Sequence, residues 1–181
     1  MINQFLNFIE IKTKITSIFA FLLAAAYLFY RQQPINWRLT AIFFASMFIF
    51  DLTTTSINNY IDTKTNDQKL QFKRKTALLI LLLLLSISTL LGLYLAILTD
   101  LVVLFLGGLC FLTGIFYTFG PIPISRLPFG EILSGLFYGF FIPFLMLYMN
   151  MPEGTYLTYG LKTEPLSIFV SFNIIPIITV I

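Results

Sequence analysis

Apolar segments long enough to cross a bilayer follow one another along this chain, and they limit the folds open to it. A helix of about 20 residues spans the hydrocarbon core of a membrane. Hydrophobic residues make up 58% of the 181 residues and charged residues only 10%, whereas soluble domains carry about 25% charged residues. One soluble core of this size cannot bury so much apolar surface, so the sequence predicts an integral membrane protein.

The spacing of the apolar segments favours helices, because runs of this length do not fit the short alternating strands of a membrane barrel. We therefore expect an all-α, polytopic transmembrane bundle, with one domain over residues 1–181. Only Thr99 and Asp100 separate the third and fourth spans, which predicts a tight antiparallel hairpin. The predicted spans are 15–30, 39–59, 77–98, 101–119 and 131–149, and the chain stops inside a sixth, 166–181.

The distribution of basic residues predicts the orientation in the membrane, because cytoplasmic loops carry an excess of lysine and arginine. Three of the eleven lie on one predicted side: Arg31, Arg38 and Lys162. The other side holds Lys12, Lys14, Lys64, Lys69, Lys73, Arg74, Lys75 and Arg126. We expect a multi-pass protein of the cell membrane whose N-terminus, 60–76 loop and 120–130 loop face the cytoplasm. The small net charge of +3 gives no indication of nucleic-acid binding.

Polar side chains at the end of the second span carry the strongest functional signal. Asn58, Asp62 and Asn66 recur at every fourth residue, so they share one face of a helix. Thr55 and Asp51 lie on the same face, deeper in the membrane. An aspartate at bilayer depth costs about 2.5–3.5 kcal/mol, so we expect a cation, a water-filled cavity or a partner group to offset the charge of Asp51.

The chain has no histidine and a single cysteine, so a metal ion would be bound mainly by oxygen atoms. Carboxylate and amide oxygens are ligands that suit Mg²⁺. Carboxylates repel a diphosphate, so a metal ion must lie between the two. Asp62 and Asp67 can supply carboxylates and Asn58 an amide oxygen, which indicates a site for Mg²⁺ and a diphosphate. The alternative interpretation is structural, with amides and threonines that hydrogen-bond between helices.

Basic side chains on the same predicted side can neutralise the remaining phosphate charge. We expect Lys12, Lys14 and Lys75 to contact phosphate or a substrate carboxylate, with Lys73 and Arg74 nearby. The alternative is the ordinary charge bias of cytoplasmic loops.

The segment after the fourth predicted span adds a candidate cavity residue. Gly120-Pro121 ends that span, because proline cannot continue the helical hydrogen-bond ladder. Tyr117 is then about one turn inside the membrane, where it either faces a cavity or belongs to the interfacial belt of aromatic residues.

Together these segments resemble the UbiA superfamily of membrane prenyltransferases. Its first motif, Asn-Asp-x-x-Asp-x-x-x-Asp, is similar to residues 58–67, where Asn59 replaces an aspartate, Asn66 stands at the ninth position and the carboxylate moves to Asp67. Two further segments resemble its MenA branch, which prenylates 1,4-dihydroxy-2-naphthoate: Glu10-Ile-Lys-Thr-Lys14, and Tyr117-Thr-Phe-Gly-Pro121 with the later Gly130-Glu131.

The resemblance implies a nine-helix bundle of which about six helices are present, so that residues 1–181 would be a C-terminally incomplete prenyltransferase domain. It implies Mg²⁺-dependent transfer of a polyprenyl group from polyprenyl diphosphate to a small aromatic acceptor, giving demethylmenaquinone in menaquinone biosynthesis. Catalytic roles would fall on Asn58, Asp62 and Tyr117, and metal binding on Asn58, Asp62 and Asp67. Substrate contacts would fall on Lys12, Lys14, Asn59, Asn66 and Lys75.

Other functions remain open at this point. Within the superfamily the acceptor can be 4-hydroxybenzoate or a haem precursor. A transporter or channel segment would place Asp51 and Asp62 on an ion path, although the third and fourth spans carry no internal charge. A non-catalytic membrane subunit that completes its site with another chain is a third possibility. The sequence does not indicate an oligomeric state.

Overall fold

The computed structural model describes residues 2–65, 70–119, 130–151, 157–163 and 166–172. Five of its helical segments are long and apolar enough to cross a membrane: Ile11–Tyr30, Trp37–Thr63, Arg74–Leu98, Leu101–Thr118 and Gly130–Asn150. They coincide with the first five predicted spans, so the prediction of a bundle of helices long and apolar enough to cross a membrane is confirmed.

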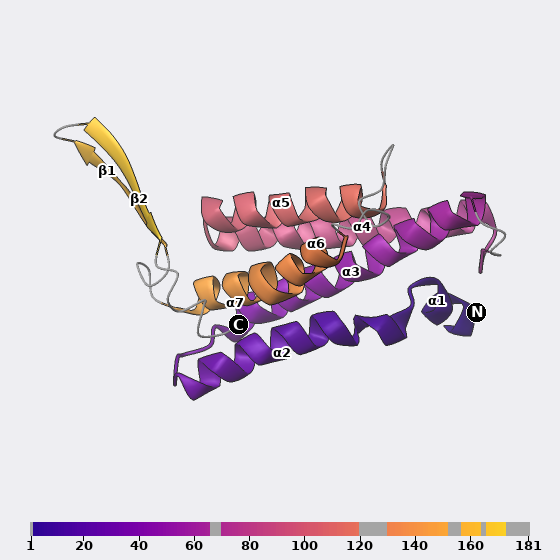
Figure 1. The fold of residues 1–181 in the computed structure, drawn as a ribbon, viewed down its shortest axis with the longest axis horizontal. Coiled ribbons are helices and arrows are strands. Elements are labelled where there is room, and N and C mark those ends of the chain that lie inside the picture. Colours follow the sequence, from indigo (N-terminus) through magenta and orange to yellow (C-terminus); the bar gives the residue numbers. More distant parts are fainter. Residues whose placement is uncertain (1, 66–69, 120–129, 152–156, 164–165, 173–181) are drawn as a thin grey trace.

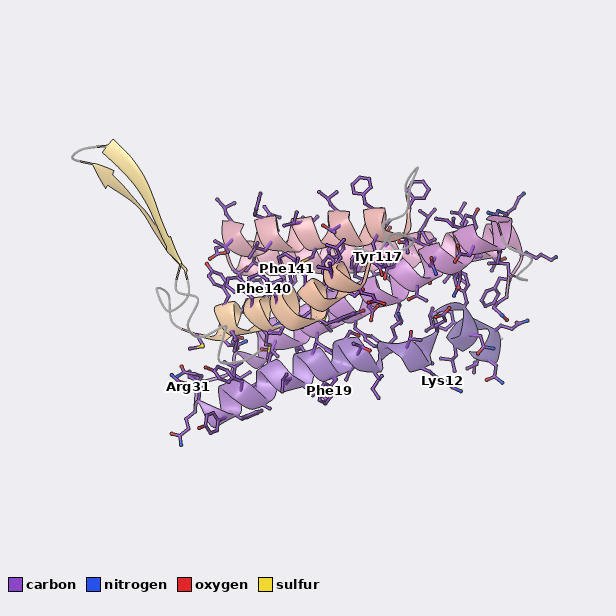
Figure 2. The ribbon with its side chains drawn as sticks, viewed as in Figure 1. Lys12, Phe19, Arg31, Tyr117, Phe140 and Phe141 are labelled. Atoms are coloured by element: carbon purple, nitrogen blue, oxygen red, sulfur yellow. The ribbon has the colours of Figure 1, made fainter. Side chains whose placement is uncertain are left out.

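The N-terminal region consists of α1 (Ile2–Phe8), the 3₁₀ turn η1 (Ile11–Lys14) and α2 (Ile15–Tyr30). Glu10 has a left-handed backbone with φ of 47°, and it interrupts the helix between α1 and η1. As a result α1 folds across the end of the bundle instead of continuing along α2 (Figure 1). Phe19 is 67% exposed and points away from the bundle, where lipid would surround it (Figure 2).

Three long helices form the next layer: α3 (Trp37–Thr65), α4 (Arg74–Leu98) and α5 (Leu101–Thr118). In Figure 1, α4 and α5 lie next to each other on one side of α3, and α2 lies on the other side. The predicted tight hairpin between α4 and α5 is confirmed. Asp100 begins α5 as its N-cap, since Oδ1 accepts from the backbone N–H groups of Val102 at 2.9 Å and Val103 at 3.1 Å.

The fifth span contains α6 (Gly130–Leu136), the π-helical turn η3 (Phe137–Phe141) and α7 (Ile142–Asn150). Pro143 has no N–H to donate back into the preceding turn, and the wider π-helical turn ends two residues before it, at Phe141. Tyr148 donates a hydrogen bond to Asp100, while Asn150 accepts from the Asn36 backbone at 2.7 Å. These contacts fix α7 against the hairpin tip and the start of α3.

The prediction of a sixth span is wrong for residues 166–172. Strand β1 (Leu157–Thr163) pairs antiparallel with β2 (Leu166–Phe172), so a two-stranded hairpin accompanies the all-helical bundle and projects beyond the end of α7 (Figure 1). β-Branched and aromatic residues favour a strand, and Ser167 and Ser171 interrupt the apolar run. Residues 173–181 lie outside the described part of the chain.

Candidate functional site

A buried ion pair joins η1 to the middle of α3. Lys14 Nζ lies 3.0 Å from Asp51 Oδ1, and the two side chains are only 4% and 15% exposed. Ser17 donates to Asp51 Oδ2 at 2.7 Å, and Lys14 also donates to Thr55. The expected compensation for the charge of Asp51 is therefore a partner group, and that group is Lys14.

The local backbone explains how a lysine reaches the interior. Thr13 donates to the carbonyl of Glu10 at 2.8 Å, and the Ser17 hydroxyl, whose single proton is shared with Asp51, lies 2.9 Å from the carbonyl of Lys14. These bonds fix the 3₁₀ turn and the first turn of α2. Of the threonines near Asp51, Thr55 makes the contact between helices that the structural interpretation anticipated.

The three predicted basic contacts are in different environments. The charge of Lys14 is already paired with Asp51, whereas Lys12 and Lys75 are exposed. In Figure 2, Lys12 and Arg31 lie at opposite ends of α2, with Lys12 just before the start of the helix. Lys75 is in the first turn of α4. Two of the three predicted lysines are thus accessible to a charged ligand.

Asn58 and Asp62 lie on the same face of α3 as Asp51. They follow it by seven and eleven residues, which puts them within about 20° of its direction and roughly 10 and 16 Å further along the helix axis. Both are intermediate in exposure. The predicted shared face therefore runs from the buried ion pair to the end of α3.

Asn59 has a structural contact, because its Nδ2 donates to the carbonyl of Phe8 at 2.9 Å. It thereby ties α1 to α3. Next to it, the Arg74 guanidinium lies 4.3 Å from the centre of the Tyr60 ring and fixes the start of α4. Asn66 and Asp67 lie outside the described residues.

The donor set at the end of α3 is small but chemically suited to magnesium. Asp62 offers one carboxylate and Asn58 one amide oxygen, and Mg²⁺ commonly takes one or two carboxylates together with phosphate oxygens and waters. Within the described ranges there is no group of three or more histidine, cysteine, aspartate or glutamate side chains that could hold a metal by itself. A metal here would depend on a phosphate ligand or on residues near 66–67.

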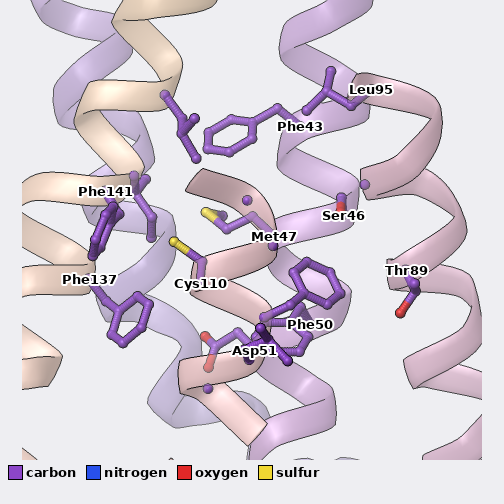
Figure 3. A pocket seen from close by; sticks show the side chains of 18 of the residues that line it. Phe43, Ser46, Met47, Phe50, Asp51, Thr89, Leu95, Cys110, Phe137 and Phe141 are labelled. Carbon is purple, nitrogen blue, oxygen red and sulfur yellow. The ribbon is translucent and has the colours of Figure 1, made fainter. Parts of the chain in front are cut away.

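A pocket of about 420 Å³ lies between α3, α4, α5 and the fifth span (Figure 3). Its walls are mostly aromatic and aliphatic, with Phe43, Phe137 and Phe141 among them. Asp51 lines it too, so the ion pair and the pocket meet at this residue. Closely packed rings form part of the wall, since Phe50 and Phe111 stack with centroids 3.9 Å apart.

Tyr117 also lines the pocket, so the interpretation that it faces a cavity is confirmed. Its Oη lies 3.3 Å from Ser134 Oγ, which joins the end of α5 to α6. Ser134 and the aromatic wall from η3 were not among the residues predicted from the sequence. A local signal existed: an aromatic-rich run directly precedes Pro143, and π-helical turns are frequent at functional sites.

No protein-family model, curated protein or solved structure matches this chain.

Proposed function

We propose that this protein is a Mg²⁺-dependent membrane prenyltransferase of the UbiA type. It would transfer a polyprenyl group from polyprenyl diphosphate to an aromatic acceptor, with 1,4-dihydroxy-2-naphthoate as the first candidate. One observation carries the proposal. The face of α3 that bears Asn58 and Asp62 continues to Asp51, which lines a largely apolar pocket of about 420 Å³. A ligand with a charged head and a hydrocarbon tail would fit this arrangement, with its head at the polar residues near the end of α3 and its tail in the apolar pocket.

The head of the substrate would bind at the end of α3, on the cytoplasmic side. Asn58 and Asp62 would hold Mg²⁺, with Asp67 and Asn66 as further candidates from the sequence. Bound Mg²⁺ would neutralise part of the diphosphate charge and so make the diphosphate a better leaving group. Lys12 and Lys75 are exposed, and the topology predicted from the sequence puts both on the cytoplasmic side. There they would attract the phosphates.

In the proposed reaction, the bond between the allylic carbon and the diphosphate oxygen breaks, and its electron pair leaves with the diphosphate. A ring carbon of the acceptor supplies the electron pair for the new carbon–carbon bond. The ring then loses a proton or, in the carboxylated naphthoate, CO₂. The apolar walls would exclude water from the allylic cation, and aromatic faces such as Phe137 and Tyr117 would attract it by about 0.5–2 kcal/mol each.

The test is a transfer assay in membranes that contain the protein expressed from its complete reading frame. Labelled polyprenyl diphosphate is supplied with 1,4-dihydroxy-2-naphthoate or 4-hydroxybenzoate, with and without Mg²⁺. We expect Mg²⁺-dependent formation of the prenylated naphthoate and release of diphosphate. Asp62→Ala should abolish both while leaving the amount of inserted protein unchanged.

Asn7→Ala is a matched control, since Asn7 is an exposed amide on α1. Undiminished transfer in Asp62→Ala would refute the metal assignment. Transfer to 4-hydroxybenzoate alone would keep the enzyme class and change the acceptor.

A membrane transporter is the second candidate, and the ion pair between Lys14 and Asp51 favours it. Ionisable residues within a membrane commonly mark ion or proton paths. Proteoliposomes separate the two functions: a transporter gives ion flux without diphosphate release, and a prenyltransferase gives the reverse.

A further inference from the structure

The pocket has two ends of different chemistry. Asp51, Tyr117 and Ser134 line it toward the end of α5, where the hydroxyls of Tyr117 and Ser134 are 3.3 Å apart. Val103 and Leu145 line it toward the start of α5 and the middle of α7. An elongated ligand with one polar end can therefore satisfy both ends in only one direction.

Two glycines of α5 leave part of the apolar wall without side chains. A Cβ atom added at Gly107 or Gly108 would meet no heavy atom within 4 Å, and both residues line the pocket. The glycines that pack against neighbouring helices differ from them. A Cβ at Gly114 would lie 2.6 Å from the ring of Phe50, and one at Gly92 would lie 3.3 Å from Ser46 Oγ.

Among the described residues, Gly107 and Gly108 thus face open space, whereas Gly114 and Gly92 pack against a neighbouring helix. Gly107 is intermediate in exposure and Gly108 is exposed, and a Cβ added at either of these lining positions would not clash with the protein. At this level of the pocket, two adjacent lining positions therefore contribute no side chain.

We propose that Gly107 and Gly108 determine which hydrocarbon chains the pocket accepts, with the chain lying beside them and its polar end toward Asp51, Tyr117 and Ser134. That the chain is an isoprenoid rests on the proposed function. The methyl branches of an isoprenoid need a wider passage than a linear acyl chain of equal length, and the glycine pair provides that width.

The experiment uses photolabelling in lipid nanodiscs with an analogue of geranylgeraniol that carries a diazirine at the end of its tail. We expect labels on the apolar half of the pocket, on α5 between Val103 and Gly108 and on the facing part of α7. Unlabelled geranylgeraniol should compete, and linear oleyl alcohol should compete at least tenfold less well.

Gly107→Leu and Gly108→Leu should each reduce labelling at least tenfold. Gly135→Leu is the matched control, because a Cβ there also meets nothing within 4 Å and Gly135 does not line the pocket. The control should keep wild-type labelling. This result would separate occlusion of the pocket from the general effect of replacing a glycine in a membrane-spanning helix.

Equal labelling of wild type and both leucine variants would overturn the proposal, as would equal competition by oleyl alcohol, which would indicate an ordinary lipid contact. A dimer that Gly108→Leu dissociates would also overturn it, because a helix of a second copy would then fill the groove. Failure of the prenyltransferase proposal has a different signature: labelling that depends on the glycine pair, without any Mg²⁺-dependent transfer.

Discussion

Asp51 and Asp62 lie on one face of one helix, yet at different places along it. The side chain of Asp51 is 15% exposed; it is paired with Lys14, accepts a hydrogen bond from Ser17 and lines the pocket. Asp62 is intermediate in exposure, roughly 16 Å further along the axis, near the end of α3. The two carboxylates therefore differ in their place along α3: Asp51 is paired with a lysine near the middle of the helix, and Asp62 lies close to its end.

The cost of charge explains this difference. A charge at bilayer depth must be compensated within the protein, and the pairing of Asp51 with Lys14 leaves neither group for a diphosphate. A carboxylate at a helix end can remain hydrated and exchange water for a metal. Asp51 is thus expected to control stability, and Asp62 to control activity.

The largest expected effect is on stability, from Asp51→Leu. The change leaves the Lys14 ammonium buried without its carboxylate, and breaking a buried pair in this way costs about 3–5 kcal/mol. Unfolding in mixed detergent micelles, followed by circular dichroism, measures the loss.

The double variant Lys14→Met with Asp51→Leu is its control. Replacement of both charges by apolar groups of similar size is often close to neutral, so we expect most of the lost stability to return. Equal destabilisation in the single and double variants would show that the ion pair itself is not the source.

The second effect is on activity, from Asp62→Asn. The amide keeps the size of the side chain but removes the charge that would hold Mg²⁺, and loss even of the groups that support metal ligands costs about 10–100-fold. We expect transfer to fall by roughly a hundredfold or more, with a free energy of unfolding within about 1 kcal/mol of wild type.

Raising the Mg²⁺ concentration should restore part of the activity of Asp62→Asn, because a weakened metal site is filled by mass action. A variant that unfolds as readily as Asp51→Leu would erase the contrast between the two aspartates.

The helical part of the fold follows from the sequence because lipid requires long apolar helices, and five spans were predicted on that ground alone. The sixth was wrong at 166–172, where apolar length by itself does not separate a helix from a β-hairpin. Pairing between Leu157–Thr163 and Leu166–Phe172 depends on hydrogen bonds between two segments, which a hydropathy pattern does not contain.

The candidate site was predictable in the same limited way. The shared face of Asp51, Asn58 and Asp62 follows from helical periodicity. The partner of Asp51 does not, because it depends on how η1 turns Lys14 into the bundle. From the sequence, a lysine near the end of a membrane span is interpreted as a phosphate contact or as part of the charge bias of cytoplasmic loops. Only the distance between Lys14 and Asp51 identifies Lys14 as the ion-pair partner inside the bundle.

A third effect tests how tightly the interior around Asp51 is packed. In Gly114→Ala the new methyl group would lie 2.6 Å from the ring of Phe50, the neighbour of Asp51 in sequence. The stacked pair of Phe50 and Phe111 must move, which costs about 1–3 kcal/mol. Gly107→Ala, with no heavy atom within 4 Å, is the control and should be within about 1 kcal/mol of wild type in unfolding experiments.

The smallest effect concerns the other end of α3, at Asn59. Asn59→Ala removes the 2.9 Å hydrogen bond to the Phe8 carbonyl, worth about 1 kcal/mol. Because that bond holds α1 across the end of the bundle, the loss should be local: faster amide hydrogen exchange in Ile2–Phe8 and unchanged exchange in α5. Asn7→Ala, which changes an exposed amide on α1 itself, should leave both regions unchanged. Accelerated exchange throughout the bundle would mean that the end of α3 is as firmly coupled to the core as Asp51, and that depth alone does not divide the helix into a structural half and a ligand-binding half.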